Sequence, residues 1–174
     1  MSNSNFEDNT NRNRNKKCSL CKRFAEILGA EVMESREDLC LVGFNRDLDV
    51  EILGIRTRSP LVLPALFSFE PARNNGRNRN SRNNRNNEEN RNDRDDREDR
   101  NNERALNLGE IVLLQEEVND FITVLRRNNI IVTALHNHWL FEEPRLMYLH
   151  FESVDQPLDF ARGVAEALRT LRRC

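Results

Sequence analysis

The residues with the clearest capacity for chemistry are the three histidines, His136, His138 and His150, which fall within fifteen residues of one another. Imidazole binds transition metals and exchanges protons near neutral pH. Residues two apart on a β-strand point to the same side of the sheet. The rings of His136 and His138 are therefore presented together if this segment is a strand, and a histidine from the next strand can complete a three-ligand set. The spacing predicts a site for a metal ion or a small ligand.

The geometry of this site depends on how two strands pair. Residues 130–139 and 145–152 are predicted to form strands joined by a five-residue loop. If the loop centres on Glu142, Ala134 faces His150 and all three imidazoles share one face of the hairpin. A slip of one residue would turn His150 to the opposite face. The hypothesis of a histidine site therefore depends on the register of this hairpin.

Three imidazoles and a carboxylate suit a divalent transition metal such as Zn, Fe or Mn. In a catalytic version the metal would polarise a bound water, and Glu117 or Glu143 would act as the base. The residues that we expect to contact a small ligand are Asn119, Asn137, Arg145 and Tyr148. Three alternatives stay open: histidines that only support the fold, a catalytic histidine without a metal, and a Tyr148 that is simply a core residue. Whether the chain is an enzyme is also left open.

The four cysteines are Cys18, Cys21, Cys40 and Cys174. The first two form a lone C-x-x-C, whereas a zinc ribbon needs a second such pair and a redox motif needs a preceding strand. The sequence shows neither a secretory signal nor a stretch long and apolar enough to span a membrane. We therefore expect a cytoplasmic protein without a membrane partner, its cysteines present as thiols. Metal binding with Cys40 or Cys174 and redox chemistry are the alternatives.

Composition divides the chain. Hydrophobic residues make up 37% of it, below the usual fraction of a globular protein, and the deficit is concentrated in two Asn/Arg-rich segments, residues 1–17 and 73–104. Such segments cannot bury enough apolar surface to offset the entropy lost on ordering. We expect a disordered arm and a disordered insertion within one domain, residues 18–174. Both segments carry net positive charge, so the rest is more acidic than the formal net charge of −2 indicates, which disfavours nucleic acid as a ligand of the core.

Hydrophobic periodicity predicts the elements that position the histidines. A strand at 109–114, an amphipathic helix from Val118 to Arg127 and the two strands of the hairpin are followed by a helix that starts near Pro157. Upstream, a short helix near 21–28 and strands near 39–44, 48–52 and 65–69 are expected. This order indicates an α+β fold with a mainly antiparallel sheet and helices on one face. Its C-terminal half has the character of a ferredoxin-like split βαβ unit.

Several sequence blocks resemble the LppY/LpqO family, a bacterial domain of unknown function. They are Gly109–Leu113, Glu117–Asn119, Val132–His138, Glu143–Phe151 and Pro157–Leu168. The resemblance covers about residues 18–72 and 105–170, on either side of the insertion. It implies a shared fold and marks Glu117, Asn119, His136, Asn137, His138, Glu143, Arg145 and His150 as site candidates, but it implies no activity.

Two functions follow from these observations. The first is a metal- or small-ligand-binding protein whose site lies on the histidine-bearing hairpin. The second is a non-enzymatic binding or assembly module, in which the Asn/Arg-rich segments make weak contacts with protein or RNA and the histidines support the fold. A homo-oligomer is compatible with either.

Overall fold

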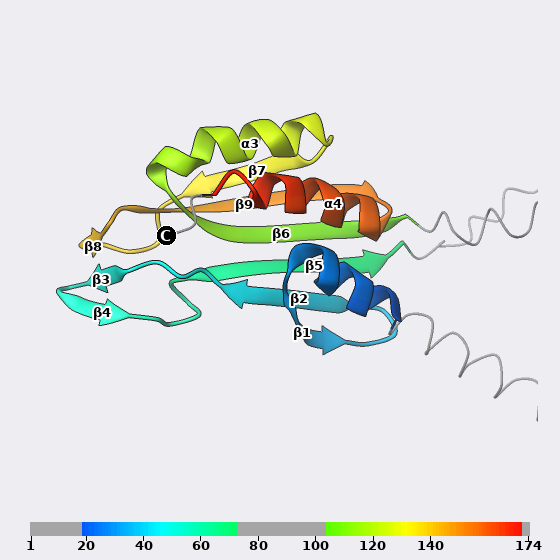
Figure 1. The fold of residues 1–174 in the computed structure, drawn as a ribbon, viewed down its shortest axis with the longest axis horizontal. Coiled ribbons are helices and arrows are strands. Elements are labelled where there is room, and N and C mark those ends of the chain that lie inside the picture. The colour runs from blue at the N-terminus through cyan, green and yellow to red at the C-terminus, as the bar shows by residue number, and fades with distance from the viewer. Residues whose placement is uncertain (1–18, 73–103, 172–174) are drawn as a thin grey trace, which may run out of the picture.

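The computed structural model describes residues 19–72 and 104–171 (Figure 1). The segments predicted to be disordered, residues 1–17 and 73–104, lie outside the described residues except for Arg104. The expectations for Cys18 and Cys174 also fall outside them.

The described chain forms two sheets. The larger has the order β1-β2-β5-β6-β9-β7, and every neighbouring pair of strands is antiparallel. Its strands are β1 (Glu31–Ser35), β2 (Cys40–Asn45), β5 (Pro64–Pro71), β6 (Ala105–Leu114), β7 (Ile131–His136) and β9 (Leu146–Asp155). The smaller sheet has the order β4-β3-β8, with β3 (Val50–Ile52), β4 (Ile55–Thr57) and β8 (Glu142–Glu143).

The helices are a segment over residues 19–28, α3 (Val118–Arg127) and α4 (Pro157–Leu168), with a 3-10 turn, η2 (Gln115–Glu117), leading into α3. This confirms the predicted α+β class. The C-terminal half also has the predicted split arrangement, because β9 lies between β6 and β7 and is antiparallel to both. The helix from Val118 to Arg127 has its predicted bounds, and α4 begins at Pro157, since a proline at the first helical position gives up no hydrogen bond.

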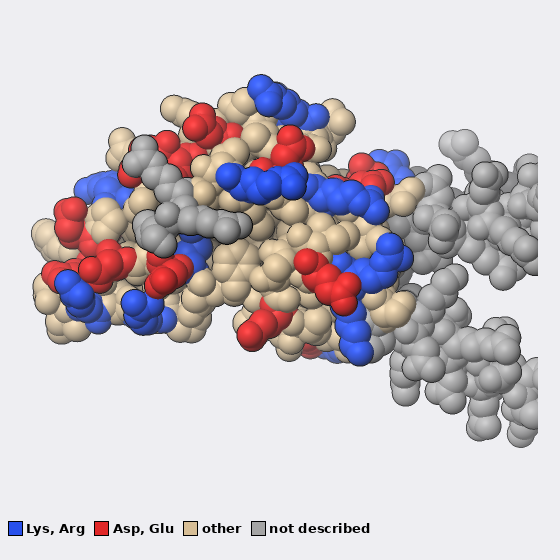
Figure 2. Space-filling view, viewed as in Figure 1, with Lys and Arg blue, Asp and Glu red and all other residues tan. Residues whose placement is uncertain are grey.

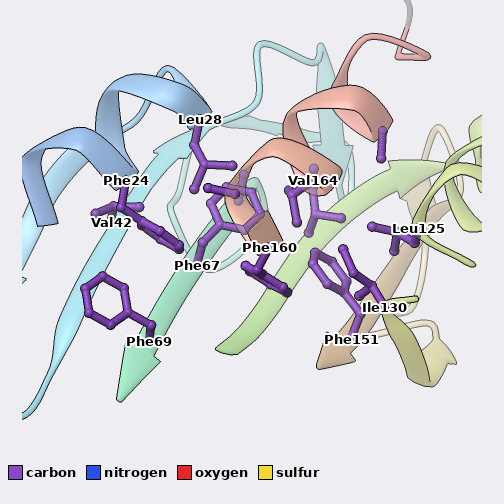
Figure 3. Packing of buried hydrophobic residues seen from close by; sticks show 14 of the residues in the cluster. Phe24, Leu28, Val42, Phe67, Phe69, Leu125, Ile130, Phe151, Phe160 and Val164 are labelled. Carbon is purple, nitrogen blue, oxygen red and sulfur yellow. The ribbon is translucent and has the colours of Figure 1, made fainter. Parts of the chain in front are cut away.

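The main core lies between the helices and one face of the larger sheet (Figure 3). Aromatic side chains dominate it: Phe24 from the first helix meets Phe69 and Phe160, and Phe151 meets Phe121 from α3. Gly109 is required here, because a Cβ at this position would lie 2.2 Å from the Phe151 ring. Alternation along the strands then sends the intervening residues of β6 and β9 to the other face of the sheet.

A second, smaller core covers only one end of that other face. It joins the small sheet to the larger one through Leu48, Val50, Val62, Leu63, Val112, Leu146 and Tyr148. The strand β8 was not predicted; it lies inside the loop of the histidine hairpin and pairs with β3, about ninety residues earlier in the chain. No helix of the described residues covers the rest of this face.

A disulfide joins Cys21 to Cys40, with 5.7 Å between their Cα atoms. The expectation that these cysteines are thiols is therefore wrong. The helix over residues 19–28 packs on the face of β2 and brings the two residues together, which the C-x-x-C spacing did not indicate. Disulfides are rare in a reducing cytosol, so the cytoplasmic location loses one of its supports and stays a prediction.

The outer side of the helical layer carries both signs of charge. Figure 2 shows Lys and Arg in a band over α4, with Asp and Glu between and around them. This side therefore lacks the continuous basic surface that nucleic-acid binding requires. No helix among the described residues has the length and apolarity needed to cross a bilayer.

Candidate functional site

The histidine hairpin has the predicted register at the positions of His136 and His150. Ala134 pairs with His150, and His136 pairs with Tyr148. The register shifts by one residue between Val132 and Ala134, but this irregularity lies beyond the histidines. His136 and His150 therefore share the face of the sheet that is turned away from the helices, as expected.

The structure brings the rings of His136 and His150 into direct contact. Their Nε2 atoms are 3.0 Å apart, and the ring centroids are 5.1 Å apart. Each ring also has an oxygen near its other nitrogen. The backbone carbonyl of Asn137 lies 3.1 Å from Nδ1 of His136, and a carboxylate oxygen of Glu110 lies 3.9 Å from Nδ1 of His150.

These contacts determine what can sit between the two Nε2 atoms. A carbonyl oxygen only accepts, so this contact is satisfied when Nδ1 of His136 carries a hydrogen, and in the neutral tautomer with that hydrogen Nε2 keeps a lone pair. The Glu110 carboxylate likewise favours a hydrogen on Nδ1 of His150. If both Nδ1 atoms are protonated, two lone pairs face each other across 3.0 Å unless a cation lies between them. The same separation is that of a hydrogen bond from one Nε2–H to the other Nε2, so the two rings can share a hydrogen or hold a metal ion between them.

His138 lies close to this pair but not on the strand as predicted, because β7 ends at His136. Its ring is 5.0 Å from that of His136 and stacks on Tyr148 at 4.2 Å between centroids. The three imidazoles therefore gather on one side of the hairpin. Among the residues that the structure describes, however, no group of three or more His, Cys, Asp or Glu side chains is placed so as to hold a metal ion.

Tyr148 is fully buried beneath the histidines. Its hydroxyl donates to the carbonyl oxygen of Val62 at 2.7 Å and accepts from the indole N–H of Trp139 at 2.9 Å. Burial raises the pKa of Tyr148 to about 12, and the negative charges of Glu142 and Glu110 add to this, whereas the Trp139 hydrogen bond acts in the opposite direction. The tyrosine expected to orient a ligand is thus a hydrogen-bonded core residue.

Glu117 and Asn119 occupy structural positions at the start of α3. The Glu117 carboxylate is buried and binds both terminal nitrogens of Arg46, at 2.5 and 2.9 Å, and the backbone N–H of Leu114 at 2.8 Å. To act as a base it would have to give up these bonds. Asn119 is exposed on α3, which packs on the opposite face of the sheet from the histidines.

The remaining candidates lie around the loop of the hairpin. The Asn137 amide donates to the carbonyl oxygen of Leu146 at 2.8 Å and so ties the end of β7 to β9. Glu143 is exposed on β8. Arg145 is exposed as well, with its Nε 3.7 Å from a carboxylate oxygen of Glu142.

Of two acidic residues near the site, Glu110 was not singled out by the sequence, and Glu142 was expected only as a carboxylate that could add a fourth ligand or a base. Glu110 faces His150 directly across β6 and β9, and only the pairing of these strands reveals it. Glu142, rather than its neighbour Glu143, is buried, and within the described residues its oxygens accept no hydrogen bond. A carboxylate at the centre of a loop gives no local signal of burial.

Comparison with known proteins adds one finding. A family model described as Domain of Unknown Function (DUF1259) matches residues 97–170. This segment contains β6, α3, β7, β9 and α4, hence all three histidines. Neither a search of curated proteins nor a search of solved structures finds a match.

Proposed function

We propose that the chain binds one divalent transition metal ion through Nε2 of His136 and Nε2 of His150. The observation that carries the proposal is the 3.0 Å separation of these two atoms while both Nδ1 atoms face oxygens. Two ligands at about 2.1 Å from one ion are about 3.0 Å apart at the right angle of octahedral coordination and about 3.4 Å apart in a tetrahedron. The separation therefore suits two neighbouring positions around a single ion.

The oxygens on the far side of each ring support the same proposal. Histidines that bind metals commonly donate their other N–H to a carboxylate or a backbone carbonyl, which fixes the tautomer and the ring orientation. Glu110 and the carbonyl of Asn137 hold these two positions. In the proposal His138 is the third ligand, because its exposed ring lies 5.0 Å from that of His136 and would turn towards the ion.

Zn, Fe and Mn are the candidate ions. With two or three imidazole ligands the ion keeps open positions, where it would polarise a water or a ligand oxygen. We also propose that the chain belongs to the LppY/LpqO family. The segment that matches the family model contains the histidine blocks that carry the resemblance to it. It supplies no reaction, so the proposal is one of binding.

Metal analysis of untagged protein tests the proposal. Protein stripped with a chelator and titrated with Zn²⁺, Mn²⁺ or Fe²⁺ should bind one equivalent of at least one ion. His136→Ala and His150→Ala should each abolish this binding while circular dichroism shows an unchanged fold. Glu110→Gln should weaken it about 10–100-fold, as expected for a group that orients a ligand.

The matched control is Glu26→Gln, an exposed carboxylate on the first helix, which should bind the metal like the unmodified protein. His138→Ala separates a three-histidine site, in which affinity falls, from a site of two. Protein that takes up none of the three ions, or that binds them equally well after loss of His136, would exclude the proposal.

A further inference from the structure

The part of the larger sheet that no described helix covers is hollowed into an open groove beside the histidine pair. The groove has a volume of about 410 Å³, within the range of small-molecule sites. Its apolar lining includes Leu41, Leu66 and Leu108, and its polar lining includes Glu110, His150 and Glu152. Apolar surface continues past the groove at Leu106 and Val154, which are 40% and 50% exposed.

Strand register places the two carboxylates in neighbouring rows across this face. Glu110 lies between Leu66 on β5 and His150 on β9, and Glu152 lies opposite Leu108 on β6. Among the residues that the structure describes, no Lys or Arg lines the groove. Its ionisable side chains are therefore two carboxylates and one imidazole.

Glu110 and Glu152 differ in their partners. Glu110 faces His150, so it balances whatever positive charge the histidine pair holds. The Glu152 carboxylate makes no hydrogen bond or ion pair with any residue in the described part of the chain. An unbalanced carboxylate beside apolar side chains attracts a cation that can also bury apolar surface.

From this complementarity we propose that the groove binds an organic cation, a molecule with an ammonium group on an apolar body. The ammonium pairs with Glu152, and the body lies over Leu108 and Leu66. A carboxylate or phosphate ligand is disfavoured, because it would meet two like charges and, among the described lining residues, neither a Lys nor an Arg. The groove shares Glu110 and His150 with the proposed metal site, but the contacts to Glu152, Leu108 and Leu66 do not require a metal to be bound.

A matched set of probes tests the charge preference. Phenethylammonium, the neutral phenethyl alcohol and the anionic phenylpropionate have similar apolar bodies. Calorimetric titration of the full chain in chelator, without metal, should rank the ammonium first, by about tenfold or more over the alcohol, as one charge-assisted hydrogen bond provides. The anion should be the weakest.

Two substitutions locate the binding. Glu152→Gln keeps the shape of a half-exposed side chain and should remove the preference for ammonium over alcohol. Leu108→Lys should abolish binding of both probes, because its ammonium takes the place of the ligand's. Glu26→Gln is the control and should change neither. Metal titration of the Glu152→Gln variant should match that of the unmodified protein, so failure of this proposal is distinguishable from failure of the metal site.

Three results would overturn the proposal. The first is equal affinity for the three probes or no binding of any, and the second is an ammonium preference that survives Glu152→Gln. The third is that a second copy of the chain occupies the face. In that case light scattering would report a dimer of the unmodified protein, and this dimer would bind no probe. The Leu108→Lys variant would be a monomer.

Discussion

The buried hydroxyl of Tyr148 should make the stability of the protein fall between about pH 10 and pH 12. In the folded chain its pKa is raised to about 12, whereas an unfolded tyrosine titrates near 10. Between these values the unfolded state loses a proton that the folded state keeps. The stabilisation is complete below about pH 10 and is lost as the pH rises towards 12.

The size of the effect follows from the two pKa values. A difference of about two pKa units corresponds to about 2–3 kcal/mol, lost at up to about 1.4 kcal/mol per pH unit. Solvent does not screen this contribution of about 2–3 kcal/mol, because the Tyr148 side chain has no exposed surface. The chain contains one tyrosine and one tryptophan, so phenolate absorbance reports Tyr148 alone and Trp139 fluorescence reports its hydrogen-bonded neighbour.

The assay is urea denaturation at a series of pH values in chelator, for the unmodified protein and for Tyr148→Phe. Lys and Arg also titrate in this range, so the difference between the two proteins isolates Tyr148. At neutral pH the variant should be about 1–3 kcal/mol less stable, because the Val62 carbonyl and the Trp139 N–H lose their partner. This gap should close as the pH approaches 12.

A phenolate midpoint near 10 in the folded protein would refute the reasoning. So would parallel pH profiles for the unmodified protein and the variant, since they would mean that the hydroxyl is not protected by burial.

Three further predictions concern stability. Reduction of the Cys21–Cys40 disulfide should lower the free energy of unfolding by about 3 kcal/mol, from the loop that it closes; the double alanine variant, whose melting temperature should not respond to a reductant, is the control. Glu117→Gln or Arg46→Met should each cost about 3–5 kcal/mol in urea denaturation, because each leaves a buried partner uncompensated, and losses no larger than those of a surface ion pair would contradict this. Replacing residues 73–103 with a short turn should leave the melting temperature unchanged, since β5 and β6 pair up to their ends beside it, and collapse of the fold would show that the segment is required.

Local pattern was enough to predict the elements of the C-terminal half. The apolar stripe of α3, the proline that opens α4 and the alternation along β9 each lie within a short stretch of sequence. The register of the histidine hairpin was also predictable, because a short connection limits how two adjacent strands can pair. These features therefore placed His136 and His150 on one face.

The end of β7 was harder to predict from the sequence. The strand was predicted to run to Trp139, yet it ends at His136. The intervening loop turns away to pair with β3, and this takes His138 off the strand.

By itself the sequence determined where the helices and the long central strands lie and which side of each is apolar, because these properties are encoded by residues a few positions apart; the short strands β1, β4 and β8 were not predicted. Tertiary structure alone decided that Glu110 faces His150, that Glu117 forms an ion pair with Arg46 and that Cys21 forms a disulfide with Cys40. Each of these contacts joins segments 19 to 71 residues apart or strands separated by a helix. Such pairings are chosen by the burial of the whole core, and no local spacing records them.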